Sequence, residues 1–197
     1  MGDPSALAIL DKRRPDYMGP YIYHAVHLHR YTLGTTYPEI GRHVKQMINT
    51  PQLRNNCALV IDVTGVGRPV YDYFTEAGMQ PIPITIVPGN QEISDGFGGW
   101  HVPKRNLVFA IQILLSERRL KLAQALEHTA ALQEELKVFQ VKVTKAGNDS
   151  YEAWRDKDHD DLVLALAIAC WYAERFVESA DEIQKRQDNA WLRMKHV

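Results

Sequence analysis

Residues 58–67, ALVIDVTGVG, constrain the fold more than any other stretch, because an apolar run ends there in one aspartate and is followed by glycines. Residues 57–61 are too few for an ordinary helix and are rich in apolar, β-branched side chains, so they predict a buried strand. A glycine turn ends this strand, and a helix begins at Arg68. A second apolar strand, 81–87, follows. Asp62 is therefore expected at the carboxyl end of a strand in a parallel pair, where α/β sheets bind their ligands.

Length and composition favour one domain with a hydrophobic core. The chain has 197 residues, of which 45% are apolar, and this is enough to bury a core. Its formal net charge is -1 with both signs spread along the sequence, so any contact with DNA has to be a local patch. Cys57 and Cys170 each lie in an apolar run, which predicts two reduced core thiols. Neither a bilayer-spanning run nor a secretory leader occurs, so we expect a cytoplasmic protein with no membrane partner.

Hydrophobic periodicity predicts the remaining elements. The expected strands are a hairpin of 5–10 with 21–32, a second hairpin of 138–144 with 151–154, and an edge strand, 120–123. The expected helices cover 36–49, 103–116 and 127–139. His27 and His29 share one face of their strand. Two histidines so placed can bind a metal, but we favour a structural, partly solvated pair beside neighbouring tyrosines.

A long polar segment joins the second apolar strand to the helix 103–116. Its sequence, PGNQEISDGFGGWHVPKR, is longer than a simple connection needs to be, so it is either functional or disordered. Lys104 and Arg105 fall in the first turn of the helix, where the helix dipole disfavours cations unless an anion is close. Together with the free N–H groups of the helix start they would hold a phosphate, and two solvated surface cations are the alternative.

A second acidic cluster precedes the most apolar helix of the chain. The sequence RDKDHDD at 155–161 runs directly into LVLALAIACWYA. One aspartate here would cap the helix, but four such close carboxylates repel one another unless a cation lies among them. Mg²⁺ or Mn²⁺, which prefer carboxylate oxygens, would be that cation. Asp158 and Asp161 share a helix face, whereas Asp160 points elsewhere.

Three segments in this order, VIDVTGVGRPV, WHVPKRNLV and YEAWRDKDHDDLVLALAIACW, resemble the C-terminal nuclease domain of the large terminase subunit of tailed bacteriophages. The resemblance extends from about residue 3 to about residue 171. It implies an α/β, ribonuclease H-like fold, with a five-stranded mixed sheet flanked by helices on both faces. It also implies a two-metal endonuclease that cuts concatemeric phage DNA during genome packaging.

The resemblance assigns roles to residues of this chain. Asp62, together with Asp161 or its neighbour Asp160, is implied to be catalytic and to hold two ions of Mg²⁺ or Mn²⁺. Asp158 is a further candidate metal ligand. The expected contacts to the DNA backbone are Lys104, Arg105 and Arg68.

The sequence departs from the family in two respects. It contains no GxxxxGK[ST] loop, so it cannot drive DNA translocation with ATP by that route. The family's first strand, which carries the first metal ligand, would lie just before Asp3, so we expect that strand to be missing; Asp3, in the turn after it, is a candidate substitute for the lost ligand. We then expect the strands 5–10 and 57–61 to pair directly, or a second copy of the chain to complete the sheet as a homodimer.

These observations leave three hypotheses. The first is a nuclease domain at 3–176, followed by a helical tail at 177–197. Its partners would be double-stranded DNA, the terminase motor domain, the small terminase subunit and the portal, in the cytoplasm of a bacterial host. The second is a catalytically silent prophage remnant that binds DNA or a packaging partner. The third, a nucleotide-binding module that uses Gly65 and Gly67, is weaker because their spacing fits no dinucleotide fingerprint.

Overall fold

The computed structural model describes residues 4–15, 19–65, 67–123, 125–145 and 160–176. They form an α/β structure with two sheets. The first sheet has the order β1-β2-β7 and contains β1 (Ala6–Arg13), β2 (Ile22–Arg30) and β7 (Leu120–Leu122). The second has the order β3-β4-β6-β5 and contains β3 (Leu59–Asp62), β4 (Pro81–Val87), β6 (Trp100–Pro103) and β5 (Ile93–Ser94).

Both sheets are mixed. In the first, β1 and β2 are antiparallel and β7 runs parallel to β2. In the second, β3, β4 and β6 are parallel, and the short β5 is antiparallel to β6. The helices are α1 (Tyr37–Ile48), α2 (Gly67–Glu76), α3 (Lys104–Ser116), α4 (Thr129–Lys145) and α5 (Asp161–Arg175).

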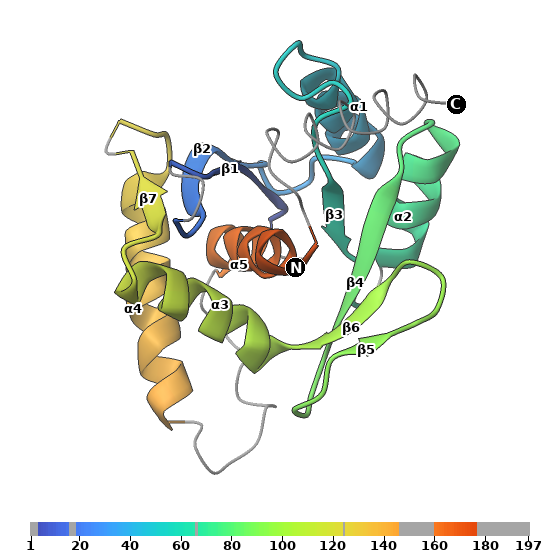
Figure 1. Cartoon of the computed structure of the whole chain (residues 1–197). Helices are drawn as coiled ribbons and strands as arrows, with labels where there is room; N and C mark the ends of the chain where they lie inside the picture. The colour runs from blue at the N-terminus through green and yellow to red at the C-terminus, as the bar shows by residue number, and fades with distance from the viewer. Residues whose placement is uncertain (1–3, 16–18, 66, 124, 146–159, 177–197) are drawn as a thin grey trace, which may run out of the picture.

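Helix α5 lies between the two sheets (Figure 1). It packs against β1 and β2 of one sheet, β3 of the other, and the helices α3 and α4. A helix that is apolar all round needs cover on every side, and these neighbours supply it. The sheets are thus joined by side-chain packing on α5.

The expected direct pairing of the strands 5–10 and 57–61 is wrong for the described residues. Strand β1 pairs with β2, and β3 pairs with β4, but β1 and β3 belong to different sheets. A single five-stranded sheet is therefore not formed by this part of the chain. The physical reason is that β1 and β3 both pack side chains against α5, which holds these two strands in one molecule without hydrogen bonds between them.

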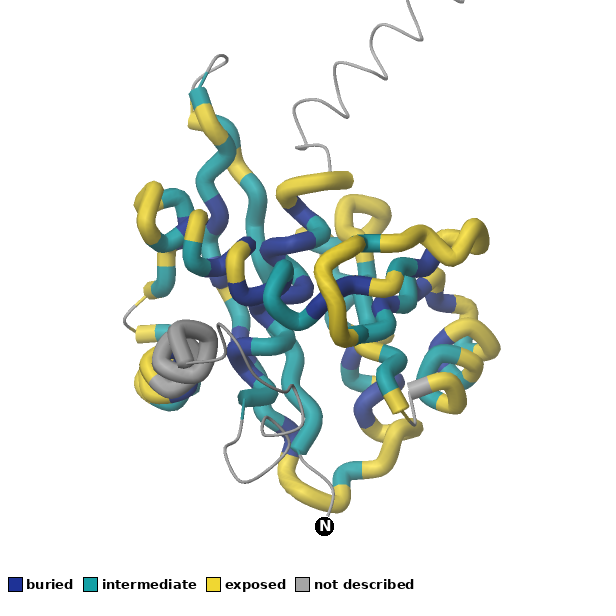
Figure 2. Tube along the Cα trace, turned by 90° about the horizontal axis from the view of Figure 1, so that it is seen from below, coloured by how far each residue is buried: buried dark blue, intermediate teal, exposed yellow. Residues whose placement is uncertain are grey.

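The core has two parts. The larger surrounds α5, whose Leu166 and Trp171 are fully buried, and includes Tyr23 of β2 and Ile84 of β4. The smaller lies under α1 and α2, and its buried members are Tyr31, Ile40, Val44, Phe74 and Met79. Figure 2 shows that buried residues gather in the interior, whereas exposed ones follow the outer loops and turns.

Most of the expected helices and strands are confirmed, with small shifts at their ends. The expected helix 36–49 is α1, which begins after Thr36; the Thr36 backbone N–H donates to Glu39 Oε2 at 2.8 Å in a capping box. The helix 103–116 is α3, and the edge strand 120–123 is β7.

Two further expectations are wrong. Residues 138–144 belong to helix α4 and not to a hairpin, because a short run of alternating apolar residues fits the end of a helix as well as a strand. Its expected partner, 151–154, lies outside the described residues, as does the tail 177–197. Cys57 is exposed because it precedes β3 in a loop, whereas Cys170 is buried as expected.

No described helix is long and apolar enough to cross a membrane.

Gly41 allows α1 and α2 to pack closely. A Cβ atom at this position would lie 2.5 Å from Tyr73 Cε1 and 3.3 Å from Phe74 Cε2. We predict that Gly41→Ala lowers the free energy of unfolding by about 1–2 kcal/mol, because overpacking outweighs the gain in helix propensity. Urea unfolding measures this change. Gln46→Ala, on the exposed side of α1, is the matched control, and equal or greater stability of Gly41→Ala would contradict the prediction.

Candidate functional site

Asp62 is the last residue of β3, as the sequence predicts, and it is exposed. One of its oxygens accepts hydrogen bonds from Thr64, from the backbone N–H at 2.8 Å and from the hydroxyl. The Thr64 hydroxyl oxygen in turn accepts from the backbone N–H of Ile86, at 2.8 Å. The turn after β3 therefore fixes this carboxylate against β4.

The carboxyl ends of β3, β4 and β6 form one edge of the second sheet. Asp62 is level with Ile84 of β4, and Ile84 is level with Trp100 of β6. Lys104 follows Trp100 by four positions and begins α3. By strand spacing, the backbones of Asp62 and Lys104 are therefore about 10 Å apart across the strands and about 13 Å apart along them.

Lys104 lies against the start of α5. Its Nζ donates to Asp160 Oδ2 at 2.8 Å, and both side chains are largely shielded from water. Asp160 stands at the N-cap position, but its side chain makes no capping hydrogen bond. The predicted phosphate-binding cation and a predicted catalytic carboxylate thus neutralise each other, as an ion pair that joins α3 to α5.

The capping role belongs to Glu135 of α4. Its Oε2 accepts a hydrogen bond at 3.0 Å from the backbone N–H of Val163, in the first turn of α5. The other oxygen of Glu135 pairs with Arg30 of β2. Arg30 Nε also lies 3.9 Å from Asp161 Oδ2. Asp161, the other predicted catalytic residue at this helix start, therefore shares a cation with a buried glutamate.

The predicted metal ligands are of the right kind for Mg²⁺ or Mn²⁺, but the structure does not gather the three that it describes, Asp62, Asp160 and Asp161, into a metal-binding group. In the part of the chain that the structure describes, no group of three His, Cys, Asp or Glu side chains is placed to hold a metal ion. Asp62 faces solvent at the end of β3, and Asp160 and Asp161 face Lys104 and Arg30. Asp158 and Asp3 lie outside the described residues.

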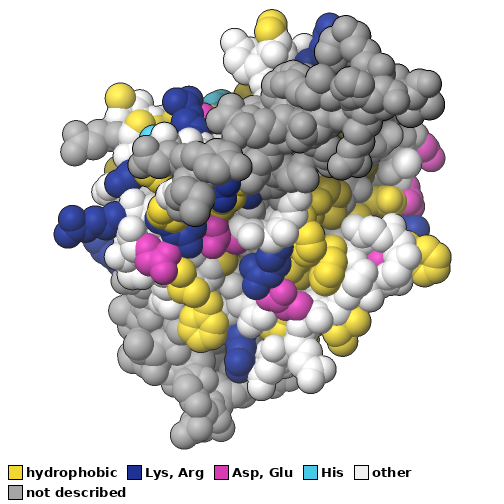
Figure 3. Space-filling view, viewed as in Figure 1, with side chains coloured by type: hydrophobic (Ala, Val, Ile, Leu, Met, Phe, Trp, Pro, Cys, Tyr) yellow, Lys and Arg dark blue, Asp and Glu magenta, His cyan; other side chains and the backbone are white. Residues whose placement is uncertain are grey.

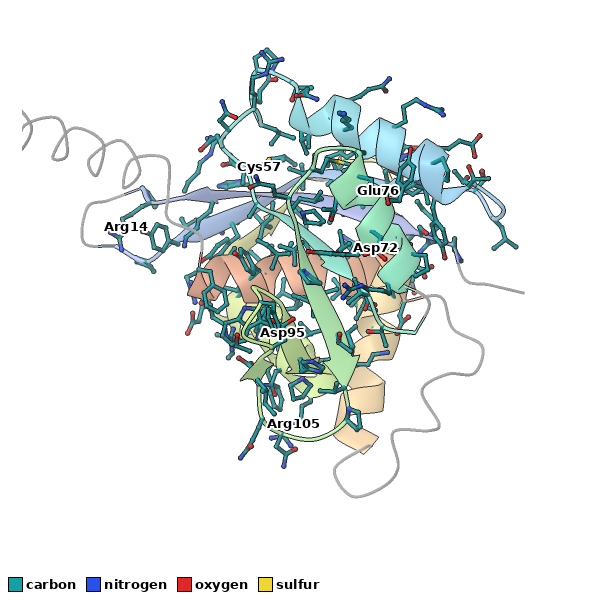
Figure 4. All side chains as sticks on the ribbon, turned by 90° about the vertical axis from the view of Figure 1, so that its right-hand side faces the viewer. Arg14, Cys57, Asp72, Glu76, Asp95 and Arg105 are labelled. Atoms are coloured by element: carbon teal, nitrogen blue, oxygen red, sulfur yellow. The ribbon has the colours of Figure 1, made fainter. Side chains whose placement is uncertain are left out.

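The other two predicted DNA-binding residues lie near this edge of the sheet. Arg105 NH1 donates to Asn90 Oδ1 in the segment before β5. Arg68 is largely exposed on α2, 3.3 Å from Asp72 and over the ring of Tyr71. Figure 4 places Arg105 at the foot of the molecule, on the opposite side from Cys57. Basic and acidic side chains intermingle on the face in Figure 3, so the visible described residues form no broad basic surface there.

The glycine-rich segment is ordered as a small hairpin of β5 and β6. Asp95 accepts hydrogen bonds from the backbone N–H groups of Phe97, at 2.7 Å, and Gly99, at 2.8 Å. These two bonds, with smaller effects of nearby cations, hold the pKa of Asp95 below its usual range. Phe97 at the tip is 94% exposed. The turn therefore presents one aromatic ring to solvent on a fixed backbone.

Glu92 anchors this segment to the core. It accepts hydrogen bonds from Trp171 Nε1 at 2.8 Å, Asn106 Nδ2 at 2.7 Å and Arg175 NH2 at 2.9 Å. Burial of Glu92 opposes its ionisation, but these donors prevail and hold its pKa below the ordinary value of 4.5. The hairpin is thereby tied to α3 and to both ends of the last turn of α5.

Three charged residues that organise the site, Arg30, Glu92 and Glu135, were not predicted from the sequence. Glu135 had a usable signal, since it follows Leu132 by three positions and lies beside Leu136 on the buried face of α4. A charge on such a face indicates a buried partner. Arg30 and Glu92 carry no comparable pattern, because their partners are distant in sequence.

Comparison of the chain with models of known families, with curated proteins and with solved structures gives no match.

We predict that Glu92→Gln lowers the free energy of unfolding at pH 7 by about 1–3 kcal/mol, because Arg175 and Trp171 lose a charged acceptor. Since the folded pKa of Glu92 is depressed, its contribution is present above the unfolded pKa and is lost as pH falls through the folded value. The variant should therefore lose less stability than the parent between pH 5 and pH 3. Urea unfolding at several pH values measures both effects.

Glu76→Gln is the matched control, because Glu76 is exposed at the end of α2. It should follow the parent at every pH. Parallel pH profiles for Glu92→Gln and the parent would show that the ionised form of Glu92 contributes nothing to stability.

Proposed function

We propose that this chain is a metal-dependent DNA endonuclease domain with a ribonuclease H-like fold, similar to the nuclease of tailed-phage large terminases. One observation carries the proposal: an exposed aspartate, Asp62, is held rigidly at the carboxyl end of a strand in a parallel sheet. Ligands of α/β proteins bind at this edge. The three segments that resemble the family contribute the same edge and the start of α5.

The residues near this edge would have distinct tasks. Asp62, with Asp160 or Asp161, would hold Mg²⁺ or Mn²⁺, and the bound ions would supply the activation of water and the neutralisation of the leaving oxygen. Arg105 and Arg68 would contact phosphates on the DNA backbone, since guanidinium groups suit this contact. Lys104 would contact a phosphate farther along the DNA backbone than the phosphate nearest Asp62.

The natural substrate on this proposal is concatemeric phage DNA, and the partners are the terminase motor domain, the small subunit and the portal. A second copy of the chain is a further proposed partner. Along their outer edges, β1 and β3 pair with no other strand among the described residues. An edge strand with free N–H and C=O groups favours the addition of another strand.

A second function is favoured by the ion pairs at the start of α5. Because Asp160 is neutralised by Lys104, and Asp161 lies beside Arg30, the described carboxylates do not repel one another as vacant metal ligands would. We infer as the alternative a catalytically silent domain, a prophage remnant, that binds DNA or a packaging partner. It differs from the nuclease in retaining DNA without cutting it.

We predict that the chain nicks supercoiled plasmid DNA in the presence of Mn²⁺ and that Asp62→Asn reduces the nicking rate at least about a hundredfold. The fold should be intact, since an asparagine Oδ1 still accepts from the Thr64 backbone N–H. Asp11→Asn is the control, because Asp11 lies at the far end of β1 beside Arg13.

Conversion of supercoiled to open-circular DNA on a gel measures the rate, with a chelator as the blank. A variant that cuts as fast as the parent would contradict the role of Asp62. DNA retention in a mobility-shift assay without any nicking by the parent would establish the alternative.

A further inference from the structure

The hairpin formed by β5 and β6 holds one aromatic ring in water at its tip. Phe97 is the most exposed of the large apolar side chains that the structure describes, at 94%. A single apolar residue on a surface is common and needs no special reason. Phe97 differs because it stands in a tight turn, where glycine, asparagine, aspartate and serine are preferred. A fixed backbone and a nearby cation also accompany it.

The backbone around Phe97 is held in one conformation. Asp95 Oδ1 accepts hydrogen bonds from the backbone N–H groups of Phe97 and Gly99, and the Asp95 backbone N–H donates to the Gly99 carbonyl at 3.0 Å. Gly96 has a φ of 78°, which disfavours any other residue. A Cβ atom at Gly99 would lie 2.9 Å from Pro83 Cγ, so the turn packs closely on β4. A ring on a fixed backbone loses less freedom when it binds a ligand.

The hairpin begins its return strand on the same level as Asp62. Asp62 is paired in register with Ile84 of β4, and Ile84 with Trp100, the first residue of β6. By strand spacing, the backbones of Asp62 and Trp100 are therefore about 10 Å apart. The turn that bears Phe97 ends directly before Trp100. A short length of nucleic acid that lies across the sheet edge at Asp62 thus reaches this turn.

A cation lies near the same turn. Arg68, in the first turn of α2, follows Asp62 by six positions and is largely exposed. The pKa of Asp95 is lowered first by its two backbone hydrogen bonds and further by the positive charges of His101 and Arg68. The guanidinium group of Arg68 is therefore within electrostatic range of the hairpin turn, between the turn and the end of β3 in sequence and in charge.

An exposed aromatic ring with a guanidinium group nearby suits a nucleotide. The ring stacks on the face of a base, and the guanidinium binds a phosphate oxygen. In an intact duplex the base faces are covered by their neighbours, so a ring stacks there only after a base step has been opened. In a single strand the faces are accessible. A protein partner would also cover an apolar ring, but it gives no reason for the cation and the carboxylate beside it.

We propose that Phe97 stacks on an unpaired base of DNA while Arg68 binds a neighbouring phosphate. The site at Asp62 then takes DNA that is single-stranded or locally opened, in preference to intact duplex. This inference rests on the proposed function for the role of Asp62, and it adds the state of the strand that is bound. Every base has a face for stacking, so the preference concerns strand state and not sequence.

Fluorescence anisotropy of a short labelled DNA strand, with a chelator present to prevent cleavage, tests the proposal on the full chain. The parent should bind the single strand more tightly than the duplex of the same sequence. Phe97→Ala should weaken binding of the single strand at least about fivefold, and Phe97→Tyr should restore it. Leu33→Ala is the control, because Leu33 is an exposed apolar side chain in the loop before α1.

A strand of the same length with abasic sites in place of its bases separates stacking from charge. The parent should bind it more weakly than the complete strand, and Phe97→Ala should bind it as the parent does. This comparison tests stacking with the parent alone, even if a variant does not fold by circular dichroism.

Equal affinity of the parent and folded Phe97→Ala for the complete strand overturns the inference and favours a protein partner for the ring. A parent that binds duplex as tightly as the single strand, or binds no DNA, overturns it as well. Nicking of plasmid by a parent with no dependence on Phe97 would leave the proposed nuclease in place without this inference. Binding that depends on Phe97 in a parent that never nicks would support the inference and exclude the nuclease.

Discussion

Burial of α5 is the constraint on which the rest of the described structure depends. Leu162, Leu166 and Cys170, on one face of this helix, and Trp171, about half a turn from Leu162, are all fully buried. Because the two sheets share no strand pairing, side-chain packing brings β1 and β3 together, mainly on α5 and also through Leu7 and Leu59 on the smaller core. The burial of apolar area is the main favourable term in folding, so a polar substitution at a fully buried position of α5 would destabilise the packing that joins the two sheets.

Charged groups fix α5 at both ends. At its start, Glu135 caps the helix and is held by Arg30. At its end, Glu174 accepts two hydrogen bonds from Arg119, at 2.8 and 2.9 Å, and one from Tyr23, and these contacts hold the pKa of Glu174 below its usual range. The same geometry explains why Asp160 and Asp161 have cations beside them: α5 is positioned by ion pairs that lie where a nuclease of this kind would bind its metal.

The sequence predicted the elements and residues that depend on a local pattern, but not the contacts between residues that are distant along the chain. The position of Asp62 followed from an apolar run broken by glycines, and α1 and α3 from helical periodicity and a capping box. Residues 138–144 were assigned to a strand but belong to α4, because their short alternation of apolar residues is compatible with a strand or with a helix. The pairing of Lys104 with Asp160 joins residues 56 positions apart, and no local signal specifies it. The division into two sheets likewise depends on how α5 packs.

Binding of Mn²⁺ at the carboxylates near Asp62 is the central claim for function, and NMR spectroscopy of the labelled chain tests it most directly. Mn²⁺ is paramagnetic and broadens the signals of nearby amides. The account predicts that the amides of Thr64 and of Asp161 lose intensity first as Mn²⁺ is added, at concentrations that support plasmid nicking. Loss that is uniform over the chain, or that begins at His29 while Thr64 is unaffected, would contradict it.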